Sequence, residues 1–103
     1  MLACKQYLDE HLSDPELRVS ALASLYGCSE VYFRRQFREC YHVSPIEYIK
    51  ARRIELACQL LQTQLYPVSE VATRAGFDSI SYFSSEFHRA MGCSPREYRE
   101  RGL

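Results

Sequence analysis

The 103-residue sequence lacks the features that would assign it to a membrane, secreted or zinc-binding class. No stretch approaches the ~18 apolar residues that a membrane-spanning helix needs, and the N-terminus does not show the basic and then apolar order of a signal peptide. The five cysteines are an odd number and form no Cys-x-x-Cys pair, so their spacing indicates neither a disulfide framework nor a zinc site. We therefore expect a cytoplasmic protein whose cysteines are reduced and pack as small apolar residues.

The sequence also has no excess of charge of either sign, because 13 basic residues balance 13 acidic ones. This argues mildly against nucleic-acid binding, since proteins that contact phosphates usually carry a basic excess. The charges are nevertheless separated along the chain. Residues 1–20 hold two basic and four acidic residues, whereas residues 29–53 hold six basic and three acidic residues. The neutral total therefore hides a basic middle segment.

Motifs typical of enzymes are missing as well. The sequence has no cluster of metal ligands, no phosphate-binding loop and no paired nucleophile and base. The cysteines lack the basic neighbours that would activate a thiol, except that Arg38 lies near Cys40. These absences predict a protein that is not an enzyme and uses neither a cofactor nor a metal.

What the sequence does contain is an internal repeat. The copies are offset by 49 residues as far as Gly27 and Gly76, and by 50 residues from Tyr32 onward, so one residue is inserted where a turn tolerates it. Two copies are fewer than a solenoid needs, but they indicate a duplicated unit. The other matched residues are Val19-Ser20 and Val68-Ser69, Ala23 and Ala72, Tyr32-Phe33 and Tyr82-Phe83, Phe37 and Phe87, and Ser44-Pro45-x-Glu47-Tyr48 and Ser94-Pro95-x-Glu97-Tyr98.

Hydrophobic spacing predicts helices throughout the chain. Phe33 and Phe37 lie one helical turn apart, as do Phe83 and Phe87, so each pair shares one face of a helix. The two Ser-Pro-x-Glu segments are capping boxes with proline at the first helical position, where its missing N–H group costs nothing. No segment alternates as a strand does. We therefore predict an all-α fold of about seven helices. The predicted bounds include a first helix at about 2–12 and a linker helix at about 45–63.

Each copy has the spacing of a helix-turn-helix unit. Such a unit needs a small residue where its two helices cross, and a residue in the turn that accepts positive φ, for which glycine has no steric penalty. Ala23 and Gly27 meet these needs in the first copy, and Ala72 and Gly76 in the second. One such pattern arises easily by chance, whereas two copies with the same capped helix behind them form a specific signal. The predicted division is a first unit at about 1–44, a linker helix at about 45–63 and a second unit at about 64–103.

With these units the sequence resembles the DNA-binding domain of the AraC/XylS family of bacterial transcription regulators, over nearly the whole chain. The most specific part runs from Gly76-Phe77 through Tyr82-Phe83-Ser84 and Phe87 to Gly92-x-Ser94-Pro95-x-Glu97-Tyr98-Arg99. The resemblance implies seven helices, with two homeodomain-like helix-turn-helix subdomains joined by a long linker helix. It implies recognition helices at about 29–41 and 79–91 in successive major-groove segments of operator DNA. It also implies RNA polymerase as a partner and a ligand-sensing or dimerisation domain N-terminal to this one in the full-length protein.

The outward face of the first recognition helix is the candidate DNA-reading surface. With the phenylalanine stripe inward, ~100° per residue places three side chains outward and Arg34 beside them. Arginine can bind guanine O6 and N7 with two hydrogen bonds, and valine can contact a thymine methyl group. The resemblance likewise implies base contacts at Val31, Arg34 and Arg35. The alternative is a solvated, charged helix face. The outward residues are Val31, Arg35 and Arg38.

The second recognition helix is less suited to base readout. Serine hydroxyls bind several bases and phosphates, so they discriminate poorly. The family commonly has arginine at the position of Ser85, and Glu86 adds a negative charge near the groove. We therefore predict that the first unit carries most base readout and that the second contributes phosphate contacts and shape readout, or, in the alternative, barely touches bases. The outward residues are Ser81, Ser85 and His88, with Ser84 and Arg89 beside them.

Two further predictions concern residues outside the recognition helices. Arg53 of the linker helix is a candidate phosphate contact, although a solvated arginine fits the sequence equally well. Tyr48 and Tyr98, at matched positions, are predicted to pack in the core. The rival function is a protein-interaction module derived from such a domain, with weak or lost DNA binding. The neutral charge and the serine-rich second unit leave that rival open.

Overall fold

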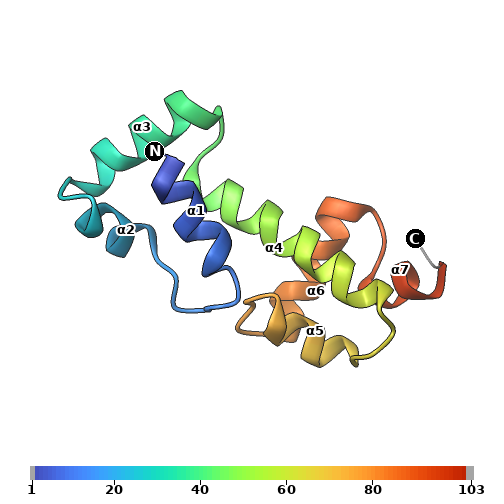
Figure 1. The fold of residues 1–103 in the computed structure, drawn as a ribbon. Coiled ribbons are helices and arrows are strands. Elements are labelled where there is room, and N and C mark those ends of the chain that lie inside the picture. Colours follow the sequence, from blue (N-terminus) through green and yellow to red (C-terminus); the bar gives the residue numbers. More distant parts are fainter. Residues whose placement is uncertain (1, 102–103) are drawn as a thin grey trace.

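The computed structural model describes residues 2–101, and within that range it has seven α-helices and no strand (Figure 1). This confirms the all-α fold predicted from the sequence. Two helix ends differ slightly from the prediction, because the first helix ends at Glu10 and the linker helix at Gln62. The helices are α1 (Leu2–Glu10), α2 (Val19–Leu25), α3 (Glu30–Tyr41), α4 (Pro45–Gln62), α5 (Val68–Arg74), α6 (Ile80–Met91) and α7 (Pro95–Arg101).

Serine side chains cap the two predicted recognition helices and the linker helix. The hydroxyl of Ser29 accepts a hydrogen bond from the Tyr32 N–H at the start of α3, and Ser79 accepts one from the Tyr82 N–H at the start of α6. Each bond satisfies one of the free N–H groups of a first helical turn. Ser44 caps α4 in the same way. These caps fix where the predicted recognition helices begin.

The chain has two hydrophobic cores that share one helix. The first core lies among α1, α2, α3 and the start of α4, and the second lies among the end of α4 and α5, α6 and α7. Ile49 of α4 belongs to the first core, whereas Ile54, Ala57 and Leu61 belong to the second. Figure 1 shows α4 running between the two groups of helices, and the molecule measures 44 × 22 × 22 Å. In the part of the chain that the structure describes, no helix is long and apolar enough to cross a membrane.

The two predicted turns have the expected backbone conformation. Gly27 follows α2 with φ +66°, and Gly76 follows α5 with φ +96°, values that glycine adopts without strain. The predicted crossing residues Ala23 and Ala72 are 2% and 1% exposed. Their carbonyls accept hydrogen bonds from the N–H groups of the residues that follow the two glycines, at 3.1 and 3.0 Å. The helix-turn-helix geometry is therefore built the same way twice.

Candidate nucleic-acid interface

The outer face of α3 presents two exposed arginines, Arg35 and Arg38. Val31 is 70% exposed, and Arg35 and Arg38 are exposed beside it, on the side of the helix opposite the buried Phe33 and Phe37. In the described part of the chain, no ion pair engages Arg35 or Arg38. Their guanidinium groups can therefore meet phosphates or base edges without first breaking an ion pair within the described structure.

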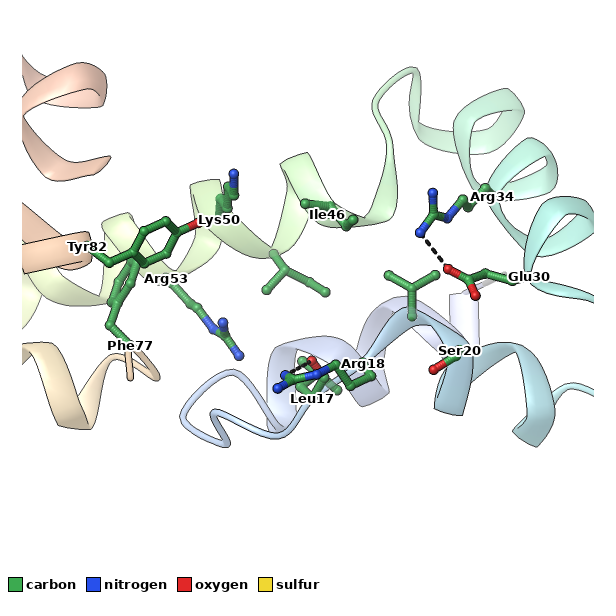
Figure 2. Close-up of a pocket in the computed structure, with 12 residues that line it drawn as sticks. Leu17, Arg18, Ser20, Glu30, Arg34, Ile46, Lys50, Arg53, Phe77 and Tyr82 are labelled. Carbon is green, nitrogen blue, oxygen red and sulfur yellow. Dashed lines mark hydrogen bonds and ion pairs between the residues drawn. The ribbon is translucent and has the colours of Figure 1, made fainter. Parts of the chain in front are cut away.

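Arg34 lies on the shoulder of the same helix and is paired. Its guanidinium contacts the carboxylate of Glu30 one turn earlier, as the dashed line in Figure 2 shows. The two side chains are 48% and 42% exposed, and an exposed pair of this kind is worth only ~0.3–0.5 kcal/mol. Arg34 can therefore exchange Glu30 for a nucleic-acid group at small cost.

The outer face of α6 is polar but carries little free positive charge. Ser81, Ser85 and His88 are exposed on it, and Ser84 is half-buried on the side of the helix toward α7. Arg89 is exposed, yet its guanidinium pairs with Glu86 at 3.2 Å. Short hydroxyl side chains reach less far into a groove than the arginines of α3. The structure therefore keeps the contrast between the two helix faces that the sequence predicts.

Glu86 does not lie on the outer face of α6, which corrects the expectation that it adds negative charge near the groove. Its side chain is 11% exposed and lies between Arg89 and Lys50 of α4, whose Nζ atom is 3.9 Å from the carboxylate. Because two cations neutralise it and α4 covers it, Glu86 joins α6 to the linker helix. The helix period alone could not reveal this contact, since it depends on which residue of α4 lies opposite.

Arg53 occupies a different environment from the other predicted contacts. It is half-buried, and its Nε and Nη2 atoms donate hydrogen bonds to the carbonyls of Leu12 and Asp14, at 3.0 and 2.9 Å. Burial lowers the pKa of its guanidinium, although arginine stays protonated in proteins. These bonds give Arg53 a role within the fold. Its contact with a phosphate stays a prediction.

A pocket of about 280 Å³ lies along α4, between the first unit and two aromatic residues of the second (Figure 2). Its walls come from the loop before α2 and the first turn of α2, the first turns of α3, α4, and the turn between α5 and α6 together with the first turn of α6. Each basic side chain that lines it already has a carboxylate or carbonyl partner in the described structure, so the pocket offers no free cation for an anionic ligand. Nor do the described residues include three or more acidic, histidine or cysteine side chains placed to hold a metal ion.

Two exposed tyrosines were not selected from the sequence. Tyr32 and Tyr82 are 52% and 45% exposed on the shoulders of α3 and α6. The repeat shows that these two tyrosines occupy matched positions. The helix period, however, placed them too close to the phenylalanine stripe to count as outward-facing. The two other matched tyrosines pack as predicted, because Tyr48 lies 5.6 Å from Phe37 and Tyr98 lies 5.5 Å from Phe87 between ring centroids.

Comparison with known proteins gives consistent matches over nearly the whole chain. A family model described as a helix-turn-helix domain matches residues 22–101. The regulatory protein SoxS of Salmonella typhimurium is 35% identical over 96 residues, which cover 93% of this chain and 89% of SoxS. Other curated relatives are longer, and the chain covers 40% of one and 31% of another.

Solved structures agree with these matches. The C-terminal domain of AraT, a response regulator from Geobacillus stearothermophilus, is 34% identical with a TM-score of 0.92, and the match covers 96% of this chain and 82% of that one. The DNA-binding domain of the transcriptional factor AdpA, solved in complex with a target DNA, is 33% identical with a TM-score of 0.92. That match covers 97% of this chain and 89% of the AdpA domain.

Proposed function

The chain belongs to the AraC/XylS family of bacterial, DNA-binding transcription regulators, and we propose that its two helix-turn-helix units contribute unequally to operator recognition. Both α3 and α6 enter successive major-groove segments of double-stranded DNA. The family is one of transcription regulators rather than enzymes. The contrast between the outer faces of α3 and α6 carries the proposal that only one unit supplies most of the base readout.

In the first unit we assign base contacts to the outer face of α3. Arg35 is exposed and has no ion-pair partner among the described residues, and an arginine in this setting binds guanine O6 and N7 with two hydrogen bonds, worth ~1–3 kcal/mol of discrimination. Val31 offers an apolar surface to a thymine methyl group. Arg38 and Arg34 lie beside these residues, and each can bind a base or a phosphate.

In the second unit we assign phosphate contacts and shape readout to α6. The hydroxyls of Ser81, Ser84 and Ser85 donate to and accept from many partners, so they position a helix without specifying a base. His88 and Arg89 add donors for phosphate oxygens. The second unit then gains its sequence preference mainly from the deformability of the DNA that it contacts.

The length of α4 supports contact by both units at once. Its 18 residues span about 27 Å at 1.5 Å per residue. Adding the width of the packed helices at each end brings the two recognition helices to a separation that suits one turn of DNA, about 34 Å. We propose the same division as the sequence indicates, with a first unit at about 1–44, the linker helix at about 45–63 and a second unit at about 64–103.

We further propose a cellular setting that follows from family membership. The domain acts in the cytoplasm, where it contacts RNA polymerase at a promoter. In the full-length protein a ligand-sensing or dimerisation domain precedes it, and the partial coverage of several longer relatives supports that arrangement. The rival interaction module gains no support from the relatives.

Selection from random DNA with the purified domain tests the proposal. We expect a recovered site with two blocks one DNA turn apart, of which the block under α3 has the sharper base preference. Affinity for that site should fall linearly on a logarithmic salt scale, with a slope of about −0.9 for each phosphate contact. Failure to recover any site, or an affinity that does not depend on salt, would contradict DNA binding. Equal sharpness in both blocks would contradict the unequal assignment.

A further inference from the structure

The two units touch directly where the loop between α1 and α2 meets the turn between α5 and α6. Gly76 lies in that turn, and a Cβ atom added to it would lie 2.1 Å from the Leu12 carbonyl oxygen and 2.8 Å from Arg53 Nε. Side chains are not found at such distances from a backbone atom, so only glycine allows this approach. Gly27 has the same place in the first unit, yet a Cβ there would meet nothing within 4 Å. The close approach is therefore particular to the junction.

Arg53 holds the same junction from the linker helix. Its guanidinium binds the carbonyls of Leu12 and Asp14 and lies against Gly76. One side chain thus connects the loop of the first unit, the shared helix and the turn of the second unit. Since the guanidinium is planar and rigid, two bonds to two different carbonyls fix its orientation as well as its position.

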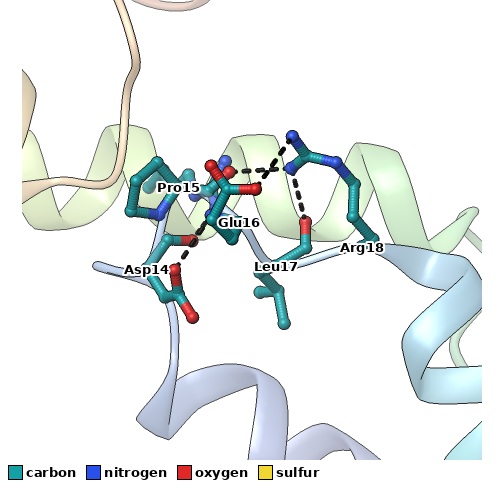
Figure 3. Close-up of polar contacts among 6 residues, drawn as sticks. Asp14, Pro15, Glu16, Leu17 and Arg18 are labelled. Atoms are coloured by element: carbon teal, nitrogen blue, oxygen red, sulfur yellow. Dashed lines mark hydrogen bonds and ion pairs between the residues drawn. The ribbon is translucent and has the colours of Figure 1, made fainter.

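The loop that Arg53 binds is itself well braced (Figure 3). The Asp14 carboxylate accepts a hydrogen bond from the Glu16 N–H at 2.9 Å, and Arg18 Nη1 donates to the carbonyls of Pro15 and Leu17 at 2.7 and 3.2 Å. The Leu17 N–H also donates to the Asp14 carbonyl at 3.2 Å. The acceptors of Arg53 therefore belong to a turn with its own internal hydrogen bonds.

Helix α1, which leads into this loop, is also tied to α4. The Tyr48 hydroxyl donates to Asp9 at 2.7 Å, and Arg52 Nε donates to the same carboxylate at 3.3 Å. The main helix contacts of each unit otherwise run within that unit or to α4. Without the junction, the relative orientation of the units would depend on a single helix, which can bend.

We propose that Arg53 and Gly76 form a bracket that fixes the orientation of one helix-turn-helix unit against the other and so determines the half-site spacing that the domain accepts. The inference rests on the proposed function, because spacing matters only if both units contact DNA. Adding one base pair moves the second half-site by about 3.4 Å and rotates it by about 34–36° around the DNA axis. A bracketed pair of units cannot follow that rotation, whereas a pair joined by α4 alone can. Arg53 is in this sense a positioning residue.

The experiment uses the selected operator in a series of duplexes whose two blocks are separated by the selected spacing, or by one or two base pairs more or fewer. Dissociation constants are measured by fluorescence anisotropy for the wild-type domain, Arg53→Gln and Gly76→Ala. Gly27→Ala is the matched control, since it places alanine at the same kind of positive φ in open space. Each protein is compared with itself across the series, so a general loss of stability does not imitate a change in spacing preference.

We expect the wild-type domain to lose at least about tenfold in affinity for a change of one base pair, because the fixed second unit loses its contacts. Arg53→Gln should lose about tenfold in affinity at the selected spacing, because units that are no longer held in place must be ordered on binding. Its preference among spacings should fall to about threefold or less, and Gly76→Ala should change in the same direction. Gly27→Ala should keep the wild-type preference.

Several outcomes would overturn the bracket. One is a wild-type spacing preference in Arg53→Gln. Another is an equal loss by this variant at every spacing, with a salt slope lower in magnitude by about one, since that combination identifies a simple phosphate contact. Failure of the wild-type domain to bind any selected DNA would instead contradict the proposed function.

A measurement without DNA keeps the two proposals separate. Residual dipolar couplings of the wild-type domain should fit one alignment tensor for both units, whereas those of Arg53→Gln should require two. One shared tensor in the variant would overturn the bracket. If Arg53→Gln does not fold, Arg53→Lys replaces it, because an ammonium group keeps the charge but cannot reproduce the fork that spans two carbonyls. A wild-type spacing preference in Arg53→Lys would also overturn the bracket.

Discussion

Inside the two units, the packing is nearly the same; on their outer faces, it is the chemistry that differs. Ring centroids of the paired phenylalanines lie 6.1 Å apart in the first unit and 5.7 Å apart in the second, and a matched tyrosine follows at 5.6 and 5.5 Å. Outside, the equivalent positions hold Arg35 and Ser85. The inner residues are constrained by close packing, in which a change of one methylene group is felt. The outer residues are exposed and not constrained in this way, so they can diverge, as the proposed inequality between the units requires.

The similarity of the two cores is tested most strongly by removing one buried ring from each. Replacing Phe37 or Phe87 with alanine removes a fully buried ring and should reduce the free energy of unfolding by about 3–5 kcal/mol in either case. Urea denaturation followed by circular dichroism measures both values. The values should agree within about 1 kcal/mol, because each ring contacts one phenylalanine and one matched tyrosine. The loss should be the larger one for Phe37, which also contacts the ring of Tyr41. A much smaller loss in one unit would show that its core relaxes around the cavity and that the resemblance of the cores is only geometric.

The difference between the outer faces of α3 and α6 can be tested with matched substitutions at Arg35 and Ser85. Arg35→Ala should reduce affinity for the selected operator by about 1–3 kcal/mol and relax base preference at one position. Ser85→Ala, at the matched position of α6, should reduce affinity by about 1 kcal/mol or less and leave base preference unchanged, because it removes at most one hydrogen bond to a phosphate. Binding titrations with operators mutated at single positions provide the test. Comparable losses of base preference in both variants would remove the proposed inequality between the units.

A smaller loss of stability is expected when the N-cap of either predicted recognition helix is removed. Ser29→Ala and Ser79→Ala each remove the side-chain acceptor of one N–H group, and each should cost about 1 kcal/mol of stability. Thermal unfolding should therefore show similar decreases in Tm for the two variants. The threonine variants serve as controls, since threonine retains a hydroxyl acceptor and should restore most of the loss.

The smallest effect concerns the capping box of α7. The carboxylate of Glu97 accepts from the Ser94 N–H at 3.2 Å, and this bond lowers the pKa of Glu97. The stabilisation is therefore present above the ordinary carboxyl pKa and is lost as the pH falls through the lowered value. Stability measured from neutral to acidic pH should depend less on pH in Glu97→Gln. In the described structure Glu47 makes no such bond to Ser44, so Glu47→Gln should change the profile less, and an equal change would argue against the bond.

The sequence was sufficient for features that depend on local order. The spacing of Phe33 and Phe37, the prolines that begin two helices and the two turn glycines all act over a few residues, and the structure confirms them. The exposed positions of Val31 and Arg35 followed from the same helix period. Their contact with bases remains a prediction, because the period gives the direction of a side chain and not its partner.

The features that the sequence did not indicate depend on residues far apart in the chain. Arg53 and Leu12 are separated by 41 positions, and nothing in the repeat marks them as partners. Gly27 and Gly76 have the same local pattern, yet only Gly76 lies against another backbone. Glu86 is covered because Lys50 of α4 lies opposite it. In each case the tertiary arrangement decides the role.

The division of α4 between two cores has a consequence for folding. Its N-terminal half is stabilised by packing around Ile49 and its C-terminal half by packing around Ile54, Ala57 and Leu61. An isolated helix of this length is only marginally stable in water, so melting of either core removes the support for half of α4 and exposes the edge of the other core. The two units should therefore unfold cooperatively. Denaturant should produce a single unfolding transition, with a steepness that corresponds to unfolding of the entire chain. A duplicated domain of this kind would then present two separate outer helix faces and still unfold as a single unit.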